Sequence, residues 1–580
     1  MPEGTPAEFS PFERALRAVE EWLDGPGAEL APRTRRPGSS RKVASWDLSI
    51  EHPRLGARPA RFSLPRDFPA SPPQVHVDKT LCLVLPHVEE DGKVCLGVES
   101  SPEHYENPLN AAEKVLTAFQ RFLEKCSDDA WISTELHNER LAYWSRFCEL
   151  SRTRLARSAP LQVRVVLGAF KNMQEEELVS YSRKGASARS DILLAAIGVA
   201  DPHMLASRHG WAVGTLVRGH CLFVELPETV RWTPADWPKN LEQLESLVAQ
   251  LTDRECSVAG WLQKNQDGDP HPYLVVLAQG TVCFGYVLTP ALVAGLTEPG
   301  VLPVPIERVD AEWALARDHG LEVLRPRRKK RVLVLGCGSL GGPVAELLAR
   351  AGIGELHLLD KETFESENCA RHVLGLKDIN ACKAINLAKR LREQIPGIEV
   401  KGHVALVSSW IVDVCRPDRF DMVVDCTGES SVRTLLAQYR QNSLGKCPVV
   451  HAWMEPYCAA AHVVFLCGGD NWPTEDPANS RVNVARWVDN GRVPLPACGA
   501  GFHPYGAADA WQAAGFAVER LLAGLDGSVP TSTIWSWVRS KGFFDSIGAD
   551  VEIGPLVPVV NSLFDAISIT RSYAQVFLND

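Results

Sequence analysis

Residues 331–371 read RVLVLGCGSLGGPVAELLARAGIGELHLLDKETFESENCAR, and this stretch gives the strongest indication of the fold of the C-terminal half of the chain. It opens with an apolar run, residues 332–335, that predicts a buried parallel strand. Three glycines follow the run in G-x-G-x-x-G spacing: Gly336, Gly338 and Gly341. Glycines at this spacing let the backbone approach phosphate oxygens, so the stretch predicts a nucleotide-binding loop between a strand and a helix.

The same stretch continues as a helix and a second strand. An amphipathic pattern covers about residues 342–350, and a second apolar run, residues 355–359, ends in Asp360. The N-terminus of such a helix offers free amides and a positive dipole to phosphates. A carboxylate at the end of the second strand accepts hydrogen bonds from ribose hydroxyls, which is the role predicted for Asp360.

Polar residues that follow the second strand distinguish this site from that of a dehydrogenase. Their order is an acid pair, an amide and two cations: Asp360 and Glu362, Asn368, Arg371 and Lys383. A dinucleotide enzyme has no need of this series, so a plain dehydrogenase is the weaker alternative. An enzyme that holds a nucleoside triphosphate while a carboxylate attacks its α-phosphate needs cations to neutralise the phosphate charge.

This series resembles the ThiF/MoeB/ubiquitin-activating superfamily of ATP-dependent adenylating enzymes. The resemblance implies ATP as cofactor, a homodimer, and catalytic roles for Arg371 and Lys383. The residues that it assigns to ATP binding are Gly336, Gly338, Gly341, Asp360, Asn368, Arg371 and Lys383.

A further superfamily motif is found in the segment Asp425-Cys426-Thr427-Gly428-Glu429. The superfamily usually carries an aspartate after the threonine, where it holds Mg²⁺ against the phosphates, and here that position is Gly428. A hard cation needs oxygen ligands beside the phosphates. Asp425 and Glu429 are therefore the predicted metal ligands.

The N-terminal part of the chain carries a different pattern. A helix is expected at residues 11–23, with strands at 43–50 and 58–64, before the proline-rich connection FSLPRDFPASPPQVHVDK. A strand at 81–85 and an extended segment, Lys93-Val94-Cys95-Leu96-Gly97, follow, and then a long amphipathic helix.

This order of helix, strands, F-P-x-x-P-P, G-x-[IV]-C-L and helix resembles the ubiquitin-conjugating fold. In that family the cysteine of G-x-V-C-L carries a thioester, which assigns the role to Cys95. The family's usual His-Pro-Asn tripeptide is missing, and Pro86-His87 stands nearby in a different order. A buried core cysteine is the alternative interpretation of Cys95.

A second cysteine motif, PLPACGAGFHPYG, covers residues 494–506. Cysteines flanked by glycine and proline, close to the start of a helix, are typical of exposed and reactive thiols. The stretch resembles the catalytic-cysteine loop of the autophagy-type activating enzymes. Cys498 is therefore the predicted nucleophile, and Cys458 is the alternative.

Composition excludes several classes of protein. The 580 residues are too many for a single core, and a net charge of -10 argues against a general nucleic-acid binder. The 16 cysteines contain no C-x-x-C pair, so a structural zinc is not supported. No apolar run reaches the length of a membrane span, and no signal segment begins the chain, so we expect a cytoplasmic protein without a membrane partner.

The sequence therefore predicts an α/β fold in three domains. These are an N-terminal α+β ubiquitin-conjugating-like domain (1–155), a mixed α/β linker domain (156–320) and a C-terminal Rossmann-like ThiF adenylation domain (321–580). Two arginines just before the nucleotide strand, Arg325 and Arg327, are either solvated surface or, as in some adenylating enzymes, contacts to a phosphate.

The two ends together resemble the bacterial fused activating–conjugating enzymes of anti-phage (CBASS) operons, in which the modifier is a cGAS-like nucleotidyltransferase. The resemblance implies that the C-terminal carboxylate of a protein modifier is adenylated, captured by Cys498 as a thioester, passed to Cys95 and joined to a target amine. Two alternatives stay open: an activating enzyme for a sulfur carrier or a bacterial ubiquitin-like protein, and a non-catalytic scaffold.

Overall fold

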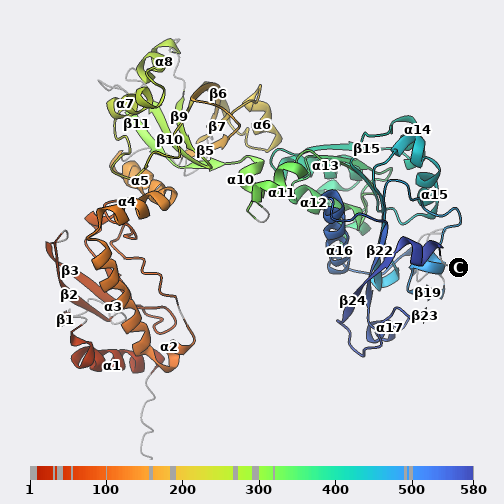
Figure 1. The fold of residues 1–580 in the computed structure, drawn as a ribbon, viewed down its shortest axis with the longest axis horizontal. Coiled ribbons are helices and arrows are strands. Elements are labelled where there is room, and N and C mark those ends of the chain that lie inside the picture. The colour runs from red at the N-terminus through yellow and green to blue at the C-terminus, as the bar shows by residue number, and fades with distance from the viewer. Residues whose placement is uncertain are drawn as a thin grey trace, which may run out of the picture. The chain divides into compact units, whose positions relative to one another are not determined.

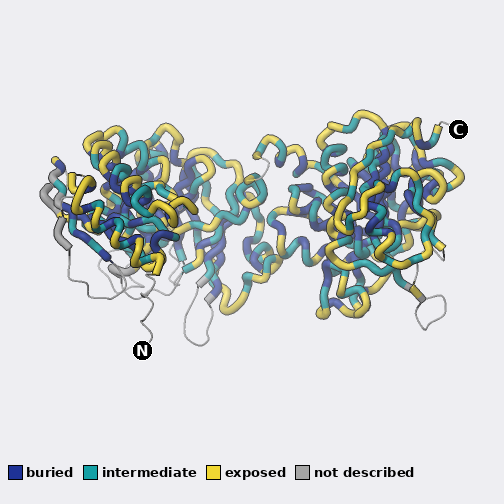
Figure 2. Tube along the Cα trace, turned by 90° about the horizontal axis from the view of Figure 1, so that it is seen from below, coloured by how far each residue is buried: buried dark blue, intermediate teal, exposed yellow. Residues whose placement is uncertain are grey.

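The computed structural model describes residues 10–29, 33–35, 44–53, 56–99, 101–155, 161–182, 191–265, 272–289, 300–317, 320–488, 493–494 and 501–578. Contacts between Cα atoms divide the chain into two compact units (Figure 1). Unit 1 comprises Met1–Pro202 and Val213–Glu307, and unit 2 comprises His203–Ala212 and Arg308–Asp580. Buried residues run through the interior of each unit (Figure 2).

Unit 1 begins with a small antiparallel sheet and its helices. The sheet has the order β1-β2-β3-β4, with bounds Arg33–Arg35, Ala44–His52, Gly56–Leu64 and Gln74–His76. Helix α1, Pro11–Asp24, confirms the predicted N-terminal helix, and it packs against α3, Pro108–Lys125. The helices bury Val19, Leu23, Val115 and Leu116 in the core that the sheet shares.

The strand predicted at residues 81–85 is wrong. The segment instead forms a 3₁₀ turn, Lys79–Leu81, followed by further turns in which Leu83 has a φ of 64°. The turn begins at Asp78, whose carboxylate accepts a hydrogen bond from the Thr80 amide at 2.9 Å. A side chain that caps its own backbone in this way competes with strand pairing, and apolar periodicity does not reveal it.

The rest of unit 1 is an eight-stranded sheet of order β11-β10-β9-β8-β6-β7-β5-β12. The strands, from β5 to β12, are Leu161–Val166, Met173–Ser182, Asp191–Ala196, Thr215–Glu225, Tyr273–Gln279, Val282–Thr289, Gly300–Val304 and Ile306–Arg308. Helices α7, Leu241–Leu251, and α8, Val258–Lys264, add to its core.

One tryptophan joins the N-terminal helices of unit 1 to this large sheet. Trp144, in α5 (Arg140–Leu155), is fully buried, and its ring centroid lies 5.1–5.2 Å from those of Trp237, Phe284 and Tyr286. Its Nε1 donates a hydrogen bond to the carbonyl oxygen of Val304 at 3.0 Å. The N-terminal and middle regions thus share one core, and the division of this unit at residue 155 stays a prediction.

Unit 2 is built on a mixed eight-stranded sheet of order β15-β14-β13-β16-β17-β18-β22-β24. The first five strands are parallel, and the last three pair in antiparallel fashion. Their bounds, from β13 to β18, are Arg331–Leu335, Glu355–Leu359, Glu399–His403, Met422–Asp425, Val449–Met454 and Ala460–Leu466; β22 is Thr533–Arg539 and β24 is Ala566–Ser572.

Helices cover both faces of this sheet, which confirms the predicted α/β fold of the C-terminal region. Val332 and Val334 of β13 face α12 (Gly341–Arg350), α13 (Lys383–Gln394) and α16 (Ala507–Leu525). Leu333 and Leu335 face α14 (Val407–Asp413) and α15 (Ser430–Gln438). Among the described helices, none combines the length and the apolar character that a bilayer crossing requires.

The order of the strands reverses beside β13. The chain proceeds from β13 to β14 and β15 on one side and then returns to β16 and β17 on the other. Neighbouring loops therefore leave the carboxyl ends of β13 and β16 in opposite directions and open a crevice between them. In open α/β sheets such a switch point is where ligands bind.

A short segment of the N-terminal half belongs to unit 2. Residues His203–Ala212 include most of helix α6, Pro202–Arg208. His209 Nδ1 lies 2.9 Å from the carbonyl oxygen of Glu393, and Arg208 Nη1 lies 3.3 Å from Glu399 Oε1. Unit 2 is thus assembled from two stretches of sequence that lie about a hundred residues apart.

Candidate active sites

A cavity of about 370 Å³ opens at the switch point of unit 2. Its lining residues are Gly336, Gly338, Leu359, Asp360, Lys361, Glu362, Ala405, Leu406, Val407, Ser408, Cys426, Thr427, Glu429, Ser431, Val432 and Leu435. Four of the predicted site residues, Gly336, Gly338, Asp360 and Glu429, are among them. Residues 405–408, which lead into α14, were not predicted, because this short and mostly apolar stretch carries no recognisable motif.

The three glycines of the loop have different structural requirements. Gly336 has a φ of 80°, in the left-handed region that favours glycine. A Cβ on Gly341 would lie 1.8 Å from the carbonyl oxygen of Gly336, so no side chain fits there. A Cβ on Gly338 would meet nothing within 4 Å, although Gly338 lines the cavity. The open space over Gly338 fits a phosphate that approaches the backbone closely.

Asp360 fixes the glycine loop as well as bordering the cavity. Its Oδ2 accepts a hydrogen bond from the Cys337 amide at 2.7 Å, and its Oδ1 accepts one from the Glu362 amide at 2.8 Å. Its own amide donates to the carbonyl oxygen of His403 at 3.1 Å. Each carboxylate oxygen keeps a second lone pair for a ligand hydroxyl.

The two predicted cations lie next to residues of the glycine loop and cavity. Lys383 is the first residue of α13 and is buried, and its Nζ lies 2.6 Å from Oε2 of the cavity residue Glu362. The Arg371 guanidinium carbon lies 5.5 Å from the centroid of the Tyr505 ring. Neither Arg371 nor Lys383 lines the cavity, whereas Lys361 does.

Two residues near these cations escaped the sequence analysis. The Tyr505 hydroxyl lies 2.5 Å from the hydroxyl of Ser339, in the glycine loop. His372 Nδ1 accepts a hydrogen bond from the Leu374 amide at 3.0 Å, so its Nε2 carries the proton and donates to the carbonyl oxygen of Cys337 at 2.5 Å. Burial lowers the pKa of His372, which keeps this neutral form. Tyr505 stands in the PLPACGAGFHPYG motif, the one signal that could have indicated it.

Asn368 has a local structural role. Its Oδ1 accepts a hydrogen bond from the Glu365 amide at 3.1 Å and closes the 3₁₀ turn Ser366–Asn368. The turn directly precedes Arg371, whose amide donates to the Asn368 carbonyl at 3.1 Å. Asn368 thus shapes the segment that carries the arginine, and its ligand role stays a prediction.

The two predicted metal ligands differ sharply in environment. Asp425 is 1% exposed, and its Oδ1 accepts hydrogen bonds from the amide and hydroxyl of Thr427 at 3.0 and 2.6 Å. Its Oδ2 lies 2.9 Å from His451 Nδ1. Glu429 borders the cavity, whereas Asp425 does not. Of this pair, Glu429 is the carboxylate whose position fits a cation beside bound phosphates.

The two arginines that precede the nucleotide strand in the sequence, Arg325 and Arg327, form ion pairs with carboxylates. Arg325 forms hydrogen bonds with both carboxylate oxygens of Glu312, at 2.8 and 3.1 Å. Arg327 is buried, and its guanidinium pairs with the carboxylate of Asp526 at 3.0 and 2.6 Å. Both guanidinium groups tie together parts of unit 2, and a phosphate contact is not supported for either.

The predicted nucleophile Cys498 lies outside the described residues. The strands on either side of its segment, β20 (Val493–Pro494) and β21 (Gly501–Phe502), pair with each other. Two other cysteines of unit 2 are poor nucleophiles: burial raises the pKa of Cys458 to about 12, and burial also raises the pKa of Cys426, which lines the cavity. A thiol that holds its proton at neutral pH is a weak nucleophile.

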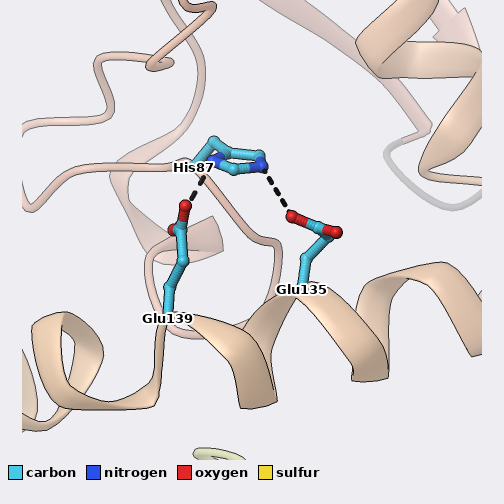
Figure 3. A group of neighbouring side chains, drawn as sticks. All are labelled: His87, Glu135 and Glu139. Atoms are coloured by element: carbon cyan, nitrogen blue, oxygen red, sulfur yellow. Dashed lines mark ion pairs between the residues drawn. The ribbon is translucent and has the colours of Figure 1, made fainter. Parts of the chain in front are cut away.

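Cys95, in unit 1, is the exposed one among the fifteen cysteines in the part of the chain that the structure describes. The alternative of a buried core cysteine is therefore wrong. Its amide donates a hydrogen bond to the carbonyl oxygen of His87 at 2.8 Å. The imidazole of His87 lies between the carboxylates of Glu135 and Glu139 (Figure 3).

Two family models match the chain. The ThiF family model matches residues 310–470, which include the cavity, and the model of prokaryotic E2 family B matches residues 38–152, which include Cys95. The chain therefore combines a ThiF region with a prokaryotic E2 region, as predicted. Cys498 lies beyond both matches.

Individual proteins share shorter stretches with the chain. The ATP-dependent ubiquitin transferase-like protein Cap2 of Vibrio cholerae is 29% identical over 239 residues, or 39% of this chain and 40% of that protein. The adenylyltransferase and sulfurtransferase MOCS3 of Mus musculus is 35% identical over 164 residues, or 26% of this chain and 35% of that protein. The chain thus spans less than half the length of these relatives.

Among solved structures, the crystal structure of Escherichia coli MccB with ATP is 18% identical to this chain. The match covers 41% of this chain and 68% of MccB, with a TM-score of 0.30.

Proposed function

We propose that this chain uses ATP to activate the C-terminal carboxylate of a protein modifier and then joins that carboxylate to an amine. The observation that carries the proposal is the presence, in one chain, of a ThiF region with a glycine-lined cavity and a prokaryotic E2 region with an exposed cysteine. Adenylation turns a poor acyl donor into a good one, and transfer through thioesters divides one difficult condensation into easier steps.

The cavity and the residues next to it fit the first step. ATP would lie with its phosphates over Gly338 and its ribose at Asp360, and Arg371 and Lys383 would neutralise charge on the phosphates. A Mg²⁺ ion would supply further positive charge at the phosphates, and Glu429 is the carboxylate that could hold it. Cys498 then takes the acyl group as a thioester and passes it to Cys95.

The partners follow from the same proposal. The modifier is a protein with a free C-terminus, for which a cGAS-like nucleotidyltransferase of a bacterial anti-phage system is our candidate, and the acceptor is an amine of a target protein. We also propose that two copies pair through their ThiF regions and that the protein acts in the cytoplasm. Light scattering that finds a fully active monomer at micromolar concentration would contradict the homodimer.

A sulfur-carrier activating enzyme is the second candidate. The similarity to an adenylyltransferase and sulfurtransferase favours it for the ThiF region. That function would make no use of the exposed cysteine in the prokaryotic E2 region, which is why we place it second. Mass spectrometry of candidate modifiers after incubation with the protein and ATP separates the two, because one predicts an amide and the other a thiocarboxylate.

Adenylation is tested by exchange of labelled pyrophosphate into ATP. The protein with its correct modifier should catalyse this exchange, and Asp360→Ala should abolish it, because the substitution removes both the predicted ribose ligand and the bond to the Cys337 amide. Undiminished exchange in Asp360→Ala would remove this residue from the site. Binding of NAD without binding of ATP would restore the dehydrogenase alternative.

The order of the two thioesters is tested with single cysteine variants on non-reducing gels. Cys498→Ala should form adenylate but no thioester, whereas Cys95→Ala should accumulate a thioester on the ThiF region and yield no amide. Cys458→Ala is the matched control and should behave as the unmodified protein, because this thiol is buried. Normal conjugation by Cys95→Ala would make the prokaryotic E2 region a binding module. A loaded Cys95 in Cys498→Ala would place the first acceptor elsewhere.

A further inference from the structure

We infer that His87, Glu135 and Glu139 form a proton-accepting group that prepares a primary amine to attack the Cys95 thioester. The inference rests on the proposed function, and it specifies the acceptor as an amine that arrives protonated, such as the side chain of a lysine. An ammonium group has no lone pair for attack, and a lysine amine holds its proton at neutral pH. A site for this acceptor therefore needs a group that removes a proton.

The position of His87 follows from its pairing with Cys95. The Cys95 amide donates to the His87 carbonyl oxygen at 2.8 Å, and the Glu89 amide donates to the Lys93 carbonyl oxygen at 2.8 Å. Between these bonds, Val88 and Val94 form an antiparallel bridge and are both buried. His87 and Cys95 are thus directly opposite each other in an antiparallel pair, next to the buried valine pair.

A buried tyrosine holds the backbone of His87 in place. His87 has a φ of 61°, an uncommon conformation for a residue with a side chain. Its amide donates to the hydroxyl of Tyr143 at 2.8 Å, and that hydroxyl donates to Glu139 Oε2 at 2.7 Å. Burial raises the pKa of Tyr143, so the phenol keeps its proton and remains the donor to Glu139. The tyrosine thereby fixes one carboxylate and the imidazole relative to each other.

The imidazole faces a carboxylate from each of its nitrogens (Figure 3). Nε2 lies 3.5 Å from Glu135 Oε2, and Nδ1 lies 3.5 Å from Glu139 Oε2. A neutral imidazole has one N–H, and the proton that it gains creates a second, so that each N–H then points to a negative charge. The side chains of His87, Glu135 and Glu139 are 24%, 29% and 44% exposed, so the group is open to an approaching amine.

The other groups around the imidazole leave this arrangement intact. The ring of Trp131 lies 6.1 Å from that of His87, and the Lys125 ammonium lies over the same tryptophan, 5.4 Å from its centroid. One imidazole and two carboxylates could also hold a divalent cation, because their ligand atoms lie within 4.8 Å of one another. A metal ion would use one ring nitrogen, whereas here both nitrogens face carboxylates. This geometry favours proton transfer over metal binding.

The transfer of the acyl group from Cys95 to the amine needs no further reactant. The group takes one proton from the ammonium and later releases it to solvent. The free amine attacks the thioester carbonyl, a carbon–nitrogen bond forms and the carbon–sulfur bond breaks. The second amine proton passes to the sulfur, which leaves an amide and the thiol of Cys95.

The test compares two nucleophiles on the full-length protein loaded at Cys95. Free lysine needs deprotonation at neutral pH, whereas hydroxylamine is already unprotonated. His87→Gln and Glu135→Gln should slow discharge to lysine at least about 10-fold, because general base catalysis typically contributes about 10²–10⁴-fold. Both variants should load Cys95 normally and discharge to hydroxylamine within about twofold of the unmodified rate. Glu113→Gln, an exposed glutamate on α3, is the matched control and should change neither rate.

Each other outcome overturns the inference. Unchanged discharge to lysine in both variants would show that the group accepts no proton, and equal slowing with both nucleophiles would show a structural role only. Loss of lysine discharge when EDTA is added after loading would indicate a divalent cation in place of proton transfer. If the unmodified protein with ATP and modifier never loads Cys95, the proposed function fails and the inference fails with it.

Discussion

The cavity of unit 2 is shaped mainly by backbone atoms, whereas the Cys95 surface of unit 1 is shaped mainly by side chains. Around the cavity, backbone atoms set the shape: Gly341 lies against the Gly336 carbonyl, and the Asp360 carboxylate accepts hydrogen bonds from the Cys337 and Glu362 amides. Near Cys95, the partly exposed side chains of His87, Glu135 and Glu139 come from separate segments and supply the inferred proton transfer. An added methyl group at Gly341 should therefore disrupt the structure around the cavity, whereas substitutions around Cys95 should lower reactivity and leave the structure intact.

Substitutions in the glycine loop should have the largest effect and test this contrast most directly. Gly341→Ala would press a methyl group against the Gly336 carbonyl, which should cost more than the roughly 1–3 kcal/mol typical of overpacking and abolish pyrophosphate exchange. Gly338→Ala has open space and should keep the melting temperature within a few degrees, yet weaken ATP binding. Calorimetry and exchange assays on the pair measure both effects. Equal loss of stability in the two variants would contradict the assigned roles.

The reactivity of the thiols toward an alkylating reagent should also differ between the two units. Iodoacetamide at pH 8 should label Cys95 within minutes and leave Cys458 unlabelled, as read by peptide mass spectrometry. Burial raises the pKa of Cys458 to about 12, so the thiol keeps its proton at that pH, and the sulfur is also out of reach of solvent. The labelled protein should still exchange pyrophosphate. Labelling of Cys458 in the folded protein would show that this part of unit 2 opens.

The smallest expected effect concerns Tyr505, which joins the segment after Cys498 to the glycine loop. Tyr505→Phe removes the hydrogen bond to Ser339 but keeps the ring beside Arg371, and one such bond contributes about 0.5–1.5 kcal/mol. We expect a few-fold slower thioester formation on the ThiF region, with pyrophosphate exchange nearly unchanged. Tyr505→Leu, which also removes the ring, should impair both steps. Identical kinetics for Tyr505→Phe and the unmodified protein would show that the hydroxyl of Tyr505 contributes nothing and that only its ring matters.

The same contrast explains what the sequence could reveal. The glycine spacing and Asp360 act through the backbone of one continuous stretch, so their places in the cavity follow from the pattern. His87, Glu135 and Tyr143 come from separate segments that only the folded structure brings together. Asp425 differs from Glu429 because it is buried and hydrogen-bonded to Thr427 and His451, and the spacing of residues in the sequence does not reveal this.

Local sequence patterns also gave wrong predictions where side-chain hydrogen bonds replace the pairing of strands. The apolar residues at 81–85 have the composition of a strand, but Asp78 starts a turn that prevents it. Apolar periodicity likewise gave no sign that Trp144 would join the N-terminal helices to the large sheet, because that contact spans a long separation in sequence. Long-range packing of this kind is the part of the fold that the sequence pattern leaves open.

The inclusion of residues 203–212 in unit 2 has a consequence for synthesis on the ribosome. Domains generally fold as they emerge, with the N-terminal one first. All of unit 1 has been made once residue 307 is complete, but His209 and Arg208 find their partners only after Glu393 and Glu399 have been added. Until then, these two contacts of His209 and Arg208 cannot form. The last native contacts of the N-terminal half therefore form only after much of the ThiF region has been translated.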